Sequence, residues 1–251
     1  MRTHGPILAI IVLAFGAGCG VEPTAGKFNF KPMASTKVPF AHEKLSLECD
    51  GSDCDSRVGL LVVDGTLTTE PMFCTAALID EQHIATASHC VAASPNCEGV
   101  SWGARMGDDL RWVACESVES TTASKNLFAR DIAILRLAQS VPQRPFEMAN
   151  RSSADGEIAT MMTITPDRFD ERIHRIRHRK CRMGDAADAH QAIGSDSHEI
   201  RWLESCPVRP GNSGAPLLND RGDMFAIVHG GGPSVFAIAL ASELVGLHSA
   251  R

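Results

Sequence analysis

Three short segments of the chain carry residue types that together could perform nucleophilic catalysis. A histidine, His89, stands in Thr-Ala-Ser-His-Cys, an aspartate, Asp131, precedes the apolar run Ile-Ala-Ile-Leu, and a serine, Ser213, lies in Pro-Gly-Asn-Ser-Gly-Ala-Pro. A serine hydroxyl becomes a good nucleophile when an imidazole accepts its proton. A carboxylate can hold that imidazole in one tautomer and stabilise its protonated form. Each residue alone is more typical of a turn or a solvated surface, but the three together predict acyl transfer.

The three segments resemble those of the trypsin-like serine peptidases, a family with the chymotrypsin fold. They follow in the order His, Asp, Ser, 42 and 82 residues apart, and the resemblance covers about residues 57–240. It implies that His89 is the general base and later the general acid, that Asp131 orients the imidazole, and that Ser213 attacks the peptide carbonyl. It also implies an oxyanion hole formed by the N–H groups of Gly211 and Ser213. We therefore expect a serine endopeptidase that works through an acyl-enzyme intermediate.

A protein of another class stays open, namely a catalytically silent protein that keeps the peptidase fold and binds a partner on the bacterial surface. The enzyme hypothesis and the silent-protein hypothesis differ in the expected reactivity of Ser213. A fluorophosphonate probe reacts with the activated serine of an enzyme and leaves a silent relative unlabelled.

Two residues beside the expected catalytic groups depart from the family pattern. Ser88 stands where the family usually has alanine, and we expect its hydroxyl to find a partner outside the mechanism. Asn212 stands where digestive relatives carry an aspartate that pairs with the ammonium group released by zymogen cleavage. A neutral amide cannot form that ion pair, and Arg57-Val-Gly-Leu differs from the usual activation sequence. Activation through a new N-terminus at Val58 is therefore not expected.

Residues after the nucleophile bear on specificity. The segment His229-Gly230-Gly231 resembles that of the bacterial glutamyl-endopeptidase branch, where a His-x-Gly-Gly segment forms one wall of the primary specificity pocket. We expect these residues and Val208 to contact the substrate side chain before the scissile bond. His229 can donate a hydrogen bond to a carboxylate, whereas the methyl groups of Val208 cannot. Glu or Asp is therefore favoured there, and a small or apolar residue stays open.

The rest of the sequence predicts the elements that position these groups. Short apolar runs separated by turn residues are typical of an all-β protein, and the chain has 21 glycines and 13 prolines. With the resemblance, they predict two six-stranded antiparallel Greek-key barrels, at about residues 57–140 and 141–240, packed with an active-site cleft between them. A short C-terminal helix is expected after residue 240.

The cysteines predict an oxidising compartment. The chain has nine cysteines, and setting Cys19 aside leaves eight, an even number that suits disulfides. Counting alone leaves the pairing open, and joining neighbours along the chain is the economical hypothesis. The resemblance supports one pair, which ties the histidine loop. The expected bridges are Cys74–Cys90, Cys181–Cys206, Cys97–Cys115 and Cys49–Cys54.

The first residues predict export. Residues 1–18 contain Arg2 and an apolar run at 7–15, which is shorter than the about 20 residues of a membrane span and typical of a signal peptide. Cys19 follows Gly-Ala-Gly and resembles the acylated cysteine of bacterial lipoproteins, although Gly16 replaces the usual aliphatic residue. A plain signal peptide cut elsewhere stays open. Residues 19–56 predict a lipid-anchored tether or pro-segment before the peptidase domain, 57–251, which would lie outside the cell or on the bacterial membrane surface.

Composition and charge exclude several kinds of partner. A net charge of −6 argues against a nucleic-acid-binding protein, and 44% hydrophobic residues argue against disorder. The basic run at 172–180 predicts a solvated strand or loop, with recruitment of anionic partners as the alternative. His174 and His178 lack a Glu-x-x-His motif, so we expect no metal and no cofactor. Protein or peptide substrates and a monomeric chain are expected.

Overall fold

A computed structural model of the chain describes several stretches of sequence, all within one compact unit, Pro32–Arg251. These stretches are residues 46–48, 55–64, 72–106, 109–121, 131–149, 154–166, 172–184, 201–204, 206, 208–228 and 237–240. Regular structure in these stretches consists of β-strands and one 3-10 turn. None of the described residues belongs to a helix long and apolar enough to cross a membrane.

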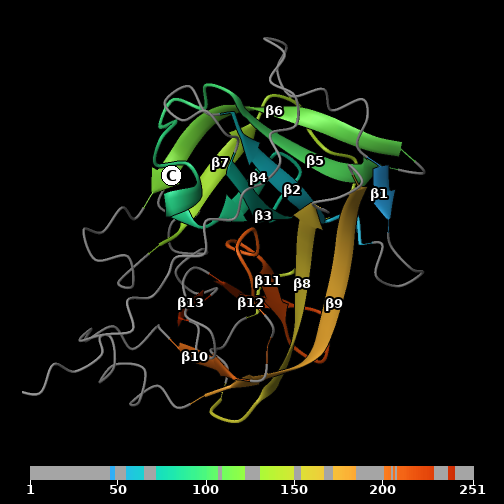
Figure 1. The fold of residues 1–251 in the computed structure, drawn as a ribbon, viewed down its shortest axis with the longest axis vertical. Helices are drawn as coiled ribbons and strands as arrows, with labels where there is room; N and C mark the ends of the chain where they lie inside the picture. The colour runs from blue at the N-terminus through green and yellow to red at the C-terminus, as the bar shows by residue number, and fades with distance from the viewer. Residues whose placement is uncertain are drawn as a thin grey trace, which may run out of the picture. The chain divides into compact units, whose positions relative to one another are not determined.

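The first barrel is a closed ring of antiparallel strands, paired in the order β2-β3-β4-β7-β6-β5 (Figure 1). Fully buried side chains of Leu61, Ala76, Ile84, Trp102 and Leu135 contribute to its core. Strands β2, β3, β4 and β7 follow short apolar runs of the sequence that turn residues end. The bounds of the strands in this barrel are β2 (Val58–Val63), β3 (Met72–Leu78), β4 (His83–Thr86), β5 (Val100–Met106), β6 (Asp109–Thr121) and β7 (Ala133–Leu137).

The second barrel is built from the later strands, paired in the order β9-β10-β13-β12-β11-β8. Antiparallel pairing of β8 with β9 joins the two ends of this series. The bounds are β8 (Ile158–Pro166), β9 (Arg172–Met183), β10 (Arg201–Glu204), β11 (Pro216–Leu218), β12 (Met224–Val228) and β13 (Ala237–Leu240). Its core includes Met161, Leu203, Leu217 and Phe225. The predicted all-β, two-barrel architecture is confirmed.

Two features of the fold bear on the sequence-based expectations. Ser46–Glu48, within the expected tether, form β1, which pairs in parallel with β9. The basic run at 172–180 belongs to β9, so of the strand and the loop that the sequence left open it forms the strand. The expected C-terminal helix lies outside the described residues, as do residues 1–45.

Among the described residues, three disulfides join neighbouring cysteines as the sequence predicts. Cys74–Cys90 and Cys97–Cys115 lie in the first barrel, and Cys181–Cys206 lies in the second. By loop entropy, a bridge that closes a loop of this size stabilises a domain by roughly 3 kcal/mol. The expected Cys49–Cys54 bridge and Cys19 lie outside the described residues.

Candidate active site

Strand pairing in the first barrel brings His89 and Asp131 together. Strand β4 pairs with β7 so that Thr86 lies opposite Ala133. The 3-10 turn η3 (Ser88–Cys90) begins two residues after β4 ends, and Asp131 stands two residues before β7 begins. The segment after one strand therefore lies beside the segment before the other. The Cys74–Cys90 disulfide ties η3 to β3 as well.

The His89 imidazole is oriented by the Asp131 carboxylate. His89 Nδ1 is hydrogen-bonded to Asp131 Oδ2, and the backbone N–H of His89 donates to Asp131 Oδ1 at 2.8 Å. The aspartate side chain is 4% exposed, whereas that of the histidine is 31% exposed. A buried carboxylate on Nδ1 leaves the other ring nitrogen, Nε2, free to serve as a base toward the more open side.

Ser88 touches this pair directly, which corrects the expectation that its hydroxyl lies outside the mechanism. Its Oγ–H donates to Asp131 Oδ1 at 2.6 Å, a length typical of a hydrogen bond to an ionised acceptor. Asp131 lies 43 residues further along the chain. The sequence signal was a hydroxyl beside the histidine where alanine is usual, but its partner became visible only in the folded chain.

These contacts keep Asp131 ionised. Burial raises the pKa of the Asp131 carboxyl, but the hydrogen bond and the charge of His89, together with the hydrogen bonds from Ser88 and from the His89 N–H, outweigh burial. The pKa therefore lies below its ordinary value. A carboxylate that stays charged at neutral pH can stabilise an imidazolium when His89 accepts a proton.

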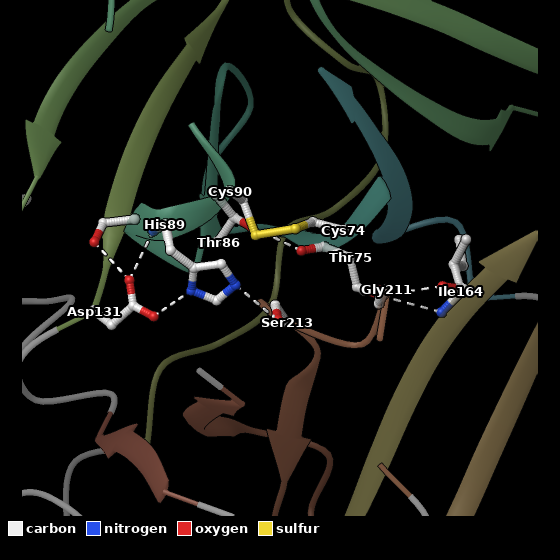
Figure 2. The surroundings of a disulfide bond; sticks show 10 residues. Cys74, Thr75, Thr86, His89, Cys90, Asp131, Ile164, Gly211 and Ser213 are labelled. Carbon is white, nitrogen blue, oxygen red and sulfur yellow. Dashed lines mark hydrogen bonds and ion pairs between the residues drawn. A yellow bond between two sulfur atoms is a disulfide. The ribbon is translucent and has the colours of Figure 1, made fainter. Parts of the chain in front are cut away.

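Ser213 comes from the second barrel and completes the row. Its Oγ lies 3.0 Å from His89 Nε2, so the imidazole lies between the carboxylate and the hydroxyl (Figure 2). Ser213 is 124 residues from His89 in sequence and stands in the loop before β11. We call residues 209–215 the nucleophile loop. The three side chains named from the sequence are thus assembled in hydrogen-bond contact, in the geometry needed to move a proton from Oγ to Nε2.

Two glycines allow the conformation of the nucleophile loop. Gly211 has a φ of +95° and Gly214 a φ of +84°, which side-chain-bearing residues rarely adopt. A Cβ atom at Gly214 would also lie 2.0 Å from the Thr75 carbonyl oxygen and 2.4 Å from Thr86 Oγ1. Within the described residues, the N–H groups of Gly211 and Ser213 donate no hydrogen bond. The two expected oxyanion donors are therefore not used to hold the loop.

Asn212 closes the nucleophile loop from within. Its side chain is buried, and its Oδ1 accepts a hydrogen bond from the Arg209 N–H at 2.8 Å. Its backbone N–H donates in turn to the Arg209 carbonyl oxygen at 3.0 Å. The neutral amide therefore makes a local bond within the loop. Val58 lies in β2 and is fully buried.

The expected specificity residues are described only in part. Val208 is partly buried and packs against the core of the second barrel. His229, Gly230 and Gly231 lie outside the described residues. That Val208 and His229 together contact the substrate side chain stays a prediction.

One cluster of potential metal ligands occurs among the described residues: Cys74, His89 and Cys90. The two sulfur atoms are joined to each other in a disulfide, so neither is a thiolate. His89 Nδ1 is already bonded to Asp131. These atoms are therefore engaged in covalent and hydrogen bonds that a metal ion would have to break.

The sequence and the fold have relatives among known proteins. Residues 74–227 match the family model described as trypsin-like peptidase domain. The fold is similar to that of GrC, with 15% identity, a TM-score of 0.63 and coverage of 80% of this chain and 96% of that chain. It is also similar to the active form of the Rv3671c protease from M. tuberculosis, with 17% identity, a TM-score of 0.55 and coverage of 82% and 89%.

A third similar structure is the scabies mite inactivated protease paralogue S-I1, with 15% identity, a TM-score of 0.62 and coverage of 80% of this chain and 96% of that chain. At such identities the likeness to solved structures shows the fold alone. No curated protein matches the sequence.

Proposed function

Because this chain belongs to the trypsin-like peptidase domain family, we propose that it is a serine endopeptidase that acts through Ser213, His89 and Asp131. One observation carries the proposal: the His89 imidazole is hydrogen-bonded to Asp131 through Nδ1 and to Ser213 Oγ through Nε2. In this arrangement the hydroxyl can lose its proton as it attacks, and the charge that forms on the ring faces a carboxylate.

The proposed reaction follows from these contacts. Ser213 Oγ bonds to the carbonyl carbon of the substrate as its proton passes to His89 Nε2, and the carbonyl π electrons move to the oxygen. We propose that the N–H groups of Gly211 and Ser213 stabilise this oxyanion. When the oxyanion collapses, the C–N bond breaks and the leaving amine takes the proton from Nε2. A water molecule then attacks the acyl carbon as its proton passes to His89 Nε2. When this second oxyanion collapses, the bond to Ser213 Oγ breaks, Oγ takes the proton from Nε2, and the acid product is released.

A silent binding protein is the second candidate, because similar folds include an inactivated protease paralogue as well as an active protease. The hydrogen-bonded row of Asp131, His89 and Ser213 favours the enzyme. Binding alone does not require the Ser213 hydroxyl to lie 3.0 Å from His89 Nε2, or the other ring nitrogen to contact the buried Asp131 carboxylate. Activation of a serine nucleophile requires both.

Covalent labelling tests the proposed function. A biotinylated fluorophosphonate incubated with the folded, oxidised protein should add one group per chain, and mass mapping should place it on the peptide that contains Ser213. The His89→Ala variant should label at least about 100-fold more slowly, because general-base assistance contributes on that order. A folded wild-type protein that stays unlabelled and cleaves no peptide would contradict the enzyme and favour the silent protein.

We extend the proposal to specificity: the site prefers Glu or Asp before the scissile bond. Support comes from the sequence, because His229 can donate to a carboxylate and Val208 cannot. Cleavage-site profiling of a peptide library should show acidic residues at that position for the wild type. The preference should fall about 10-fold or more in His229→Ala, since a hydrogen bond to a charged group contributes about 1.5–3 kcal/mol. Identical profiles for the two proteins would show that His229 does not read the substrate.

We also propose that the mature chain is exported and held on the bacterial membrane surface by a lipid on Cys19, where it cleaves proteins or peptides as a monomer. The observation is the apolar leader followed by Gly-Ala-Gly-Cys. Mass analysis of the N-terminal peptide from the native host tests the anchor, and a mature N-terminus beyond Cys19 would exclude it.

A further inference from the structure

We propose that Thr75 is a positioning residue for the oxyanion hole, because it holds the nucleophile loop on both sides of Asn212. The inference rests on the proposed peptidase function and concerns how that site stabilises its transition state. Thr75 follows Cys74 in β3 and is fully buried. It belongs to the first barrel, whereas the loop that it contacts belongs to the second.

The Thr75 hydroxyl joins the nucleophile loop to β8. Oγ1 lies 3.0 Å from the Gly211 carbonyl oxygen, and it lies 3.3 Å from both the carbonyl oxygen and the backbone nitrogen of Ile164 (Figure 2). A hydroxyl has one proton and two acceptor lone pairs. It can therefore donate the shorter bond to Gly211 and accept the Ile164 N–H, so that one oxygen satisfies groups on two separate segments.

The Thr75 backbone holds the other side of the loop. Its N–H donates to the Ser213 carbonyl oxygen at 2.8 Å, and its own carbonyl oxygen accepts the Thr86 Oγ1–H at 2.8 Å. The two loop carbonyls that Thr75 contacts thus belong to Gly211 and Ser213. These are the same two residues whose N–H groups we propose as oxyanion donors.

Holding these carbonyls restricts the oxyanion donors through neighbouring peptide planes, because each peptide group rotates as one rigid plane. The Gly211 carbonyl fixes the plane that leads to Asn212, and the Ser213 carbonyl fixes the plane that leads to Gly214. The plane that carries the Ser213 N–H lies between these two, and the plane that carries the Gly211 N–H directly precedes the first. Gly211 needs such a restraint most, since a glycine has several accessible backbone conformations and this one has a φ of +95°. Donors that are oriented before the reaction stabilise the oxyanion without a reorganisation cost.

Three substitutions separate the hydroxyl from the volume of the side chain. Thr75→Val keeps the shape and removes the hydroxyl, and Thr75→Ala and Thr75→Ser differ from each other only in that oxygen. We expect kcat per labelled site to fall about 10- to 100-fold in Thr75→Val and Thr75→Ala, because a displaced oxyanion donor loses most of its effect. KM should stay within about twofold, and Thr75→Ser should restore most of the lost rate.

Further measurements distinguish positioning from a loss of fold. Active sites are counted by fluorophosphonate titration, and rates are measured below each variant's Tm. A peptide aldehyde forms an adduct that places an oxyanion in the hole, so its affinity should fall in proportion to kcat/KM. The pH profile of kcat/KM should keep its midpoint, because Asp131 and His89 are unchanged. Thr163→Val, which removes a buried hydroxyl from β8, is the matched control and should retain wild-type kcat.

The outcomes are separable from those that test the function itself. A wild-type protein without labelling or cleavage refutes the peptidase. An active wild type with equal kcat in Thr75→Ala and Thr75→Ser, or in Thr75→Val and the wild type, refutes the role of the Thr75 hydroxyl and leaves the peptidase in place. If Thr75→Val does not fold, the comparison of the alanine and serine variants decides the same question.

Discussion

Replacing Ser213 with alanine should lower kcat/KM for peptide hydrolysis by about 10⁴-fold or more and abolish fluorophosphonate labelling. The substitution removes the oxygen that would form the acyl-enzyme, and no neighbouring group can take its place in the row. The residual rate over water should come from substrate binding and from the N–H groups of the nucleophile loop. Hydrolysis of a fluorogenic peptide at matched protein concentration measures the loss.

The fold should be almost unchanged in this variant. Ser213 Oγ is hydrogen-bonded to His89 Nε2, and the contact that holds the loop, from the Thr75 N–H, is made to the Ser213 backbone oxygen. The Tm should therefore stay within about 2 °C of the wild type. Comparable peptidase activity in a pure Ser213→Ala preparation would contradict the proposed nucleophile.

Asp131→Asn should lower kcat by about 10⁴-fold while leaving the geometry nearly intact. The loss of kcat is expected because each oxygen of Asp131 accepts different donors. Asp131 Oδ1 accepts both the Ser88 Oγ–H and the His89 N–H, whereas Oδ2 faces His89 Nδ1. In the variant, the amide oxygen is required where the two donors point, so the NH₂ group must face Nδ1.

An NH₂ group at that place reverses the tautomer of His89. Nδ1 must then accept a hydrogen bond, so the ring proton moves to Nε2, which faces Ser213. A protonated Nε2 donates to the serine hydroxyl and cannot remove its proton. Kinetics with a good ester substrate and the rate of fluorophosphonate labelling should fall together, and KM should change little.

The chain offers a matched control for this substitution. Asp80 contacts His83 Nδ1 at 2.7 Å, and the other ring nitrogen of His83 lies 3.2 Å from Glu119 Oε2. Burial raises the pKa of the Asp80 carboxyl, but hydrogen bonds from Gln82 and His83 lower it below its ordinary value. Asp80→Asn should therefore cost stability without changing kcat. An equal loss of activity in both variants would show that Asp131→Asn acts through folding rather than through the tautomer.

The comparison of the two pairs also shows why an Asp–His contact is not a site by itself. His83 lies between two carboxylates, those of Asp80 and Glu119. His89 lies between a carboxylate and a hydroxyl. The chemistry depends on what the second ring nitrogen faces, and for His89 that group comes from the other barrel.

The sequence by itself, through its apolar runs and its resemblance to the trypsin-like peptidases, determined the architecture and the three groups of the proposed mechanism. Short apolar runs ended by turn residues specify strands, because hydrophobic burial and turn chemistry act over a few residues. His89, Asp131 and Ser213 were recognisable since each stands in a local motif of several residues. The neighbouring-cysteine hypothesis also identified the bridges found among the described residues, Cys74–Cys90, Cys97–Cys115 and Cys181–Cys206.

Only the tertiary structure decided the partners of Ser88 and Thr75. Ser88 was expected to lie outside the mechanism, yet its hydroxyl contacts Asp131, 43 residues away. The residues around Thr75 do not indicate its partners, and its hydroxyl contacts Ile164 and Gly211, 89 and 136 residues away. A hydroxyl can donate to any oxygen near it, so its type specifies a capacity and not a partner. The partner depends on which strands pair and on how the two barrels meet, because those contacts join segments that are distant in the sequence.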